Sequence, residues 1–364
     1  MQEKGSSMEW QDRCEIHEDV VFFRYSNEGI EKHADEVFVW DLDKTYLDTA
    51  MDSLSQLLNT IFERSSHKKN IPGTQTLLQV LAEDWTKQKG QLRFPVFFIT
   101  ASPPQMETRI SEKFALDGLH PLGVFYKDNL RNLTPKRFWR LTKQVGYKVQ
   151  ALLQLRLRLK ENVRQICWGD DSESDAIIYN LYSDLCSRRR NSSELRQIMK
   201  ALSVPGEQIE AIFQLQSQIP ENDPVEKIYI NLATDTDPDY YQKFGRRTVP
   251  TYNAFQIALD LHQDHRLDSE SIWKVAMDMM MNFGFSPEEL QKGFDDLIRR
   301  RVLGAQYVAQ AMPFFVEKGI FARSYVPSIA PAKETNVDHG RVFELEGQFE
   351  PWVPDHIDYL HDYR

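Results

Sequence analysis

Two acids stand one residue apart in the segment VFVWDLDKTYLDT, residues 37–49, directly after a short apolar run. Carboxylates can attack an electrophile, carry a proton or bind a hard cation such as Mg²⁺. Different surroundings can separate the pKa values of two nearby acids, so the pair could divide these roles. We expect Asp41 to be a nucleophile and Asp43 to be a proton carrier that Thr45 orients.

Hydroxyl and acidic side chains also follow two later apolar runs. They are Thr100 and Ser102 after VFFI at 96–99, and Asp170, Asp171 and Asp175 after the run at 163–168. Asp, Ser and Thr are ordinary turn formers and helix N-caps, which is the simpler explanation for any one of them alone. Their joint appearance after separate runs indicates a common site.

The elements that would position these side chains alternate along the chain. Short runs rich in Val, Ile, Phe and Tyr predict strands at 37–41, 94–100, 122–127, 163–168 and 226–233. Helical periodicity lies between them, at 51–64, 74–88, 104–116, 134–144 and 148–161. Strands buried on both faces are continuously apolar, as these are. We predict an α/β fold, a doubly wound parallel sheet, with a ligand site beyond the carboxyl ends of its strands.

Composition limits the class of protein. The chain has 364 residues and 41% apolar residues, enough for one large domain and a smaller unit. Three cysteines without a CxxC pair favour a reducing compartment, and no basic, apolar leader or long apolar run appears, so we expect a cytoplasmic protein without a transmembrane segment. A net charge of −10 argues against nucleic acid as a stable partner.

The chain divides into three predicted parts. Residues 1–34 are an N-terminal extension, 35–260 carry the sheet, and 261–364 form a helical C-terminal region with an extended tail. The stretch 187–222 predicts two helices joined at VPGE, which could cover the site as a lid or pack elsewhere. The C-terminal helices carry a Met and aromatic stripe that suits core packing or contact between copies in a homo-oligomer.

In chain order, DLDKT, FFIT, a lysine and WGDDSESD resemble the four motifs of the haloacid dehalogenase (HAD) superfamily of phosphohydrolases. Asp41, Asp43 and Thr45 fill the first motif and Thr100 the second; Lys148 is the candidate for the third, and Gly169, Asp170 and Asp175 fill the fourth. Within the superfamily, FFITASPPQM, HPLGVFYKDNL, GYKVQALLQL and WGDDSESDAIIYNLY resemble the actin-patch-associated phosphatidate phosphatase catalytic domain. The family usually has Trp after the Ser-Pro pair, where this chain has Pro104.

The resemblance implies a HAD-like Rossmannoid fold and a phosphoric monoester hydrolase that uses Mg²⁺ and an aspartyl-phosphate on Asp41. The implied Mg²⁺ ligands are Asp41, the carbonyl of Asp43 and Asp170, with Asp171 and Asp175 in support. Thr100 and Lys148 would hold the phosphoryl oxygens. The further candidates for substrate contact are Ser102, Lys127, Arg246 and Arg247.

The substrate stays open at this point. The gap between the first two motifs holds two helices but not a large cap domain, so we expect little or no cap and a bulky phosphorylated substrate. A lipid such as phosphatidate is the first candidate, and a phosphoprotein, nucleotide or polynucleotide end is the second. The alternative is a non-catalytic module that binds a phosphorylated ligand or partner on the same fold. Loss of Asp41 or Asp43 would have favoured that alternative, and both are present.

Overall fold

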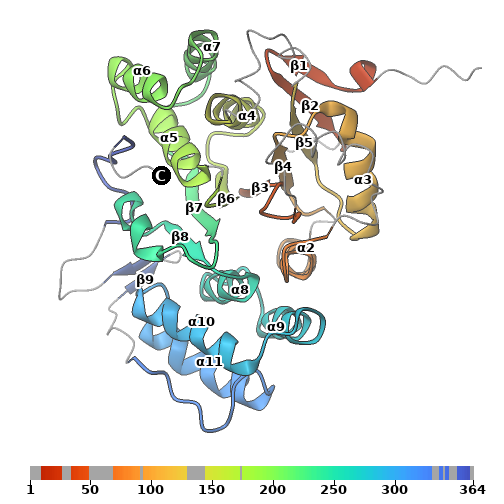
Figure 1. Cartoon of the computed structure of the whole chain (residues 1–364), viewed down its shortest axis with the longest axis vertical. Coiled ribbons are helices and arrows are strands. Elements are labelled where there is room, and N and C mark those ends of the chain that lie inside the picture. Colours follow the sequence, from red (N-terminus) through yellow and green to blue (C-terminus); the bar gives the residue numbers. More distant parts are fainter. Residues whose placement is uncertain are drawn as a thin grey trace, which may run out of the picture.

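An eight-stranded sheet forms the centre of the molecule (Figure 1). The computed structural model describes residues 10–26, 34–48, 69–90, 93–128, 144–172, 174–329, 336–338, 341–343 and 351–360. The strand order is β1-β2-β5-β4-β3-β6-β7-β8. The strands are β1 (Glu15–His17), β2 (Val20–Arg24), β3 (Glu36–Asp41), β4 (Val96–Thr100), β5 (Gly123–Lys127), β6 (Arg164–Asp170), β7 (Val225–Asn231) and β8 (Thr248–Thr251).

The six strands from β5 to β8 are parallel, which confirms the predicted α/β class. The chain builds outward from β3 through β4 to β5, then returns to the other side of β3 and continues through β6, β7 and β8. The strand order therefore reverses between β3 and β6, the position at which open parallel sheets bind ligands. β1 and β2 add an antiparallel edge beside β5.

Each central strand is buried on both faces. In β3, Val37 and Val39 point into one core, whereas Phe38 and Trp40 point into the other. On the second face the Trp168 ring stacks on Trp40, with ring centroids 4.7 Å apart, and on Tyr229 at 5.1 Å. This aromatic row ties β3, β6 and β7 together and fixes the strand ends where the acids lie.

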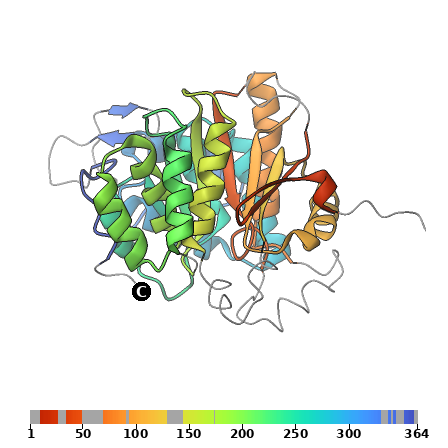
Figure 2. The ribbon, with the colours of Figure 1, turned by 90° about the horizontal axis from the view of Figure 1, so that it is seen from above.

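Helices cover the two faces of the sheet (Figure 2). One layer consists of α4 (Val145–Leu157), α5 (Asp175–Ser187), α6 (Ser192–Ala201) and α7 (Gly206–Gln216). The other contains α2 (Thr74–Lys89), the turn η4 (Pro104–Met106), α3 (Glu107–Leu116) and α8 (Ala254–Gln263). The predicted helix at 51–64 lies outside the described residues, and so does the one at 134–144 except for Gln144.

The stretch 187–222 packs as part of the first helical layer. A side chain at Gly146 of α4 would start 2.1 Å from Gln208 Oε1 and 2.7 Å from Val204, so the glycine allows α7 to approach α4 closely. Gln208 also donates to Asp19 Oδ2 at 2.7 Å. Of the two roles left open by the sequence, the packing of these two helices favours the structural one.

The C-terminal helices share the core of the second layer. They are α9 (Ser269–Phe283), α10 (Pro287–Arg299) and α11 (Ala305–Glu317), and their buried residues join those of α2 and α8 in one cluster. The expected boundary at 260/261 therefore falls inside α8. The remaining elements are the short helices η1 (Trp10–Arg13) and η7 (Pro238–Phe244) and a two-stranded sheet of β9 (Asn336–Asp338) and β10 (Arg341–Phe343). Among the described residues, no helix has the length and apolar character that a membrane crossing requires.

Candidate active site

The chain turns sharply where β3 ends. The backbone N–H groups of Tyr46 and Leu47 both donate to the carbonyl of Leu42, at 3.2 and 2.8 Å. Lys44 adopts a left-handed conformation with φ of 57°, which is uncommon for a residue with a side chain. This turn keeps the three motif residues Asp41, Asp43 and Thr45 together at the end of the strand.

Asp41 lies fully buried between a hydroxyl and an ammonium group. Thr45 donates to Asp41 Oδ2 at 3.2 Å, and Lys148 Nζ lies 2.7 Å from Asp41 Oδ1. Lys148 comes from the first turn of α4 and its side chain is only 1% exposed. The structure gives Thr45 a different partner from the expected one, because the left-handed turn at Lys44 directs its hydroxyl to Asp41.

Asp43 is held by the end of β4. Thr100 donates to Asp43 Oδ2 at 2.6 Å, and the same hydroxyl accepts from the backbone N–H of Ser102 at 3.0 Å. Tyr147 donates to the carbonyl of Thr100 at 2.8 Å. Burial raises the pKa of Tyr147 well above its ordinary value; nearby Lys148 opposes this shift, and the carboxylates of Asp41 and Asp43 increase it. Tyr147 therefore stays a neutral donor that fastens α4 to β4.

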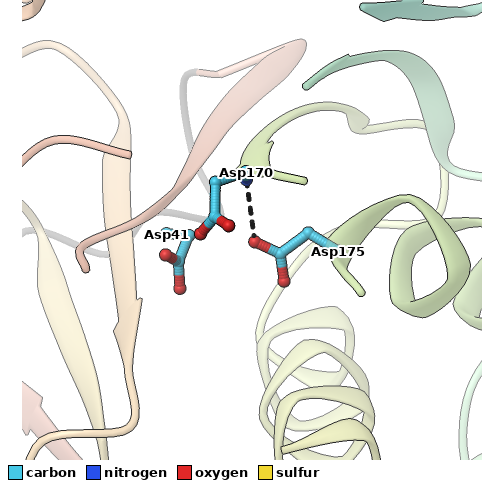
Figure 3. Close-up of side chains that lie close together, drawn as sticks. All are labelled: Asp41, Asp170 and Asp175. Carbon is cyan, nitrogen blue, oxygen red and sulfur yellow. Dashed lines mark hydrogen bonds between the residues drawn. The ribbon is translucent and has the colours of Figure 1, made fainter. Parts of the chain in front are cut away.

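Asp170 and Asp175 complete the cluster from the other side of the switch point (Figure 3). Asp175 Oδ1 lies 2.6 Å from Lys148 Nζ, and Oδ2 accepts from the backbone N–H of Asp170 at 3.2 Å. This contact requires Gly169, because a Cβ atom there would lie 2.3 Å from Asp175 Cβ and 2.4 Å from Oδ2. The Gly-Asp pair thus lets α5 bring Asp175 against the end of β6.

The cluster has the donor set of a hard-cation site. One carboxylate oxygen from each of Asp41, Asp170 and Asp175 lies within 4.8 Å of the others, and all three residues are buried. Oxygen donors of this kind suit Mg²⁺ or Ca²⁺. Because Asp175 already contacts Lys148 and the amide of Asp170, its position suits support of the cluster more than direct ligation.

Three other predicted residues lie at the same end of the sheet, beyond the carboxyl ends of its parallel strands. Ser102 and Lys127 are both buried, and the backbone N–H of Lys127 donates to the Ser102 carbonyl at 3.2 Å, which joins the ends of β4 and β5. Asp171 Oδ2 accepts hydrogen bonds from the backbone N–H of Ala233, at 2.9 Å, and from the Thr236 hydroxyl. Asp171 therefore fastens the loop after β7, a role that the sequence does not reveal.

The structure does not bring Arg246 and Arg247 to the site. Both directly precede β8, so they lie at the amino end of the sheet, where the Ile228 N–H donates to the Arg247 carbonyl. Arg247 is fully buried and forms an ion pair with Asp223 at 2.8 Å. The pair therefore lies away from the acidic cluster, because η7 carries the chain back to the amino end of the sheet before β8 begins.

Comparison with known protein families decides the assignment. Residues 37–197 match the family model described as phosphatidate phosphatase APP1, catalytic domain. This segment belongs to that family. The matched range begins with β3, ends in α6 and contains Asp41, Asp43, Thr100, Lys148 and Asp175. Searches of curated proteins and of solved structures gave no match.

Because it matches the APP1 catalytic domain, the segment 37–197 is a phosphatase domain, and phosphatases are hydrolases.

Two parts of this site were not anticipated from the sequence. Tyr147, next to the candidate lysine, shows only as an aromatic residue at a helix start, and the loop at 233–236 lies beyond the matched segment. Both depend on contacts between segments that are distant in the sequence, which no local pattern encodes.

Proposed function

We propose that the chain is a Mg²⁺-dependent phosphatase that hydrolyses a phosphate monoester through an aspartyl-phosphate on Asp41. The observation that carries the proposal is the contact of Asp41 with Lys148, at 2.7 Å, beside the buried carboxylate of Asp170. A fixed nucleophile, a fixed cation and an acidic metal site are the parts that phosphoryl transfer needs, since it depends on positioning and charge neutralisation.

The residues act in two steps. Asp41 attacks the phosphorus atom, and its bond to phosphorus forms as the ester bond breaks, while Asp43 gives a proton to the leaving oxygen. Water then attacks the phosphorus atom of the aspartyl-phosphate and gives a proton to Asp43, which releases phosphate and restores both acids. Thr100 holds Asp43 for both steps through its 2.6 Å hydrogen bond.

Asp41, Asp170 and the Asp43 carbonyl would hold the divalent cation. Bound there, it would offset the negative charge of the phosphate, which a chain of net charge −10 otherwise repels. Lys148 contributes a positive charge that does not depend on the metal, and Asp175 holds Lys148 in place at 2.6 Å.

Phosphatidate is the first substrate to test, because the matched family carries that activity in its description. The assay is release of phosphate from dispersed phosphatidate by the purified chain with Mg²⁺ or with a chelator. We expect release that needs Mg²⁺ and falls by roughly 10³-fold or more in Asp41→Asn, since the nucleophile is lost. Asp35→Asn is the matched control, because Asp35 is exposed and precedes the opposite end of the same strand.

Two results would contradict the proposal. One is the absence of phosphate release from any phosphate monoester tested with Mg²⁺. The other is an Asp41→Asn variant that turns over as fast as the Asp35→Asn control.

A further inference from the structure

A pocket of about 300 Å³ opens directly beside the acidic cluster. Asp170 and Asp175 form one side of it, and the start of α5 and the short helix η7 form the rest. Its apolar and aromatic lining residues are Ala176, Ile177, Tyr240, Tyr241 and Phe244. A substrate whose phosphate sits at the cluster would have this hollow beside it.

The aromatic wall of the pocket is held in place by its own contacts. Asp171 fixes the loop that leads into η7 through Ala233 and Thr236, as described above. Lys243 Nζ donates to the Tyr240 hydroxyl at 2.8 Å and lies 3.9 Å from the Tyr240 ring centroid. A wall fixed before binding loses little conformational entropy when a ligand arrives.

The charges around the pocket select against a second anionic group. None of the described residues that line it is Lys, Arg or His, while Asp170, Asp171 and Asp175 all line it. Lys148 is paired with Asp175 and Lys243 contacts Tyr240, so a nucleoside diphosphate, a polynucleotide or an acidic peptide would find no cation among the lining residues to pair with its further negative charge. A neutral, apolar group meets no such penalty.

We infer that this pocket binds the neutral part of a lipid phosphate monoester: the glycerol ester next to the phosphate and the start of one acyl chain. The volume is at the lower end of small-molecule pockets, so the remainder of a long-chain lipid extends outside it. The inference rests on the proposed phosphatase function and adds the residues that choose the substrate. These lie in η7, beyond the segment that the family model matches.

The test compares kcat/KM for two soluble substrates, dioctanoyl phosphatidate and glycerol phosphate. Both present one phosphate on a glycerol, and they differ in the acyl groups. We expect the wild type to prefer the lipid by roughly tenfold or more, and Tyr240→Ala and Ile177→Ala each to reduce that preference by roughly tenfold, the effect of lost apolar contact in a pocket. Phe213→Ala is the control, because Phe213 is half-buried on α7 and does not line the pocket.

The outcomes separate the pocket from the proposed function. Equal kcat/KM for the two substrates in the wild type would overturn the pocket assignment while leaving a phosphatase. An unchanged preference in both variants, with melting temperatures at the wild-type value, would also overturn it, as would a stronger preference for a nucleoside monophosphate. If neither substrate released phosphate, the proposed function itself would fail, and the pocket assignment with it.

Discussion

Asp41 and Asp43 are both buried, but their neighbours differ. Asp41 faces the ammonium of Lys148 at 2.7 Å, which stabilises an ionised carboxylate. Asp43 accepts a hydrogen bond from the neutral hydroxyl of Thr100 at 2.6 Å. The contact with Lys148 suits Asp41 to the role of nucleophile, and the hydrogen bond from Thr100 holds Asp43 in position to give and take a proton.

The role of Gly169 in positioning Asp175 can be tested by adding one methyl group, as in Gly169→Ala. A Cβ atom at this position would lie 2.3 Å from Asp175 Cβ, so Gly169→Ala must displace Asp175 from Lys148 and from the amide of Asp170. We expect kcat to fall by roughly 10- to 100-fold, the usual effect of losing a group that holds metal ligands, and the free energy of unfolding to fall by about 1–3 kcal/mol from overpacking. Steady-state kinetics and urea unfolding measure the two effects.

Gly206→Ala is the matched control for this substitution. Gly206 begins α7, and no atom lies within 4 Å of a Cβ placed there. It should leave kcat unchanged and keep or slightly raise stability, because Ala favours helix. Wild-type kcat in Gly169→Ala would show that the position of Asp175 does not matter to catalysis.

At the scale of elements, α9 begins with a charged cap that links it to α2. Asp268 Oδ1 accepts from the Ser271 backbone N–H at 2.8 Å, and Lys87 donates to Oδ2 at 3.0 Å. Partial burial acts to raise the pKa of Asp268, but the hydrogen bonds from Lys87 and Ser271 outweigh it and lower the pKa to about 2. The ionised cap therefore stabilises the folded chain.

Asp268→Ala should lower the free energy of unfolding by about 1 kcal/mol at pH 7. Because the folded pKa lies below the ordinary value of 3.8, this contribution is complete above about pH 4 and is lost as the pH falls through about 2. Urea unfolding of wild type and variant at pH 7 and near pH 3 gives the comparison. Asp268→Asn keeps a capping side chain, so its free energy of unfolding should fall by less than that of Asp268→Ala. If the difference in the free energy of unfolding between wild type and Asp268→Ala grew toward low pH, the account of this cap would be wrong.

The five predicted strands all appear, within two or three residues of their expected bounds, because each is a continuous apolar run buried on both faces. Three other strands of the eight-stranded sheet were missed. β2, VVFFR, lies between β1 and β5, and its antiparallel pairing with β5 is decided by tertiary contact; the edge strand β1 in turn depends on β2. β8, TVPT, contains a proline that argues against a strand unless it lies at an edge, as this one does.

Tertiary contacts also explain which of the predicted site residues lie together in the structure and which do not. Polar residues that directly follow predicted strands were placed correctly at one edge, because parallel strands end together; Asp41, Thr100 and Asp170 are of this kind. Arg246 and Arg247 follow a strand only after η7, and they lie at the start of β8, at the amino end of the sheet. Residue spacing alone does not encode that return.

At the scale of the whole molecule, the site is assembled from distant parts of one sheet. β3 supplies Asp41, α4 supplies Lys148, and the end of β6 supplies Asp170, so the chain must complete both sides of the switch point before the cluster exists. The pocket wall in η7 comes later still. The segment 351–360 also packs on the body: Tyr359 is buried and donates to Asp184 at 2.8 Å.

The central claim is that Asp41 carries the phosphoryl group during turnover. The most direct measurement is mass spectrometry of the chain after acid quench during hydrolysis of dioctanoyl phosphatidate with Mg²⁺. We predict a phosphoryl group on the peptide that contains Asp41 in the wild type, and no such adduct in Asp41→Asn. Release of phosphate at the full rate while that peptide stays unmodified at every quench time would contradict the account.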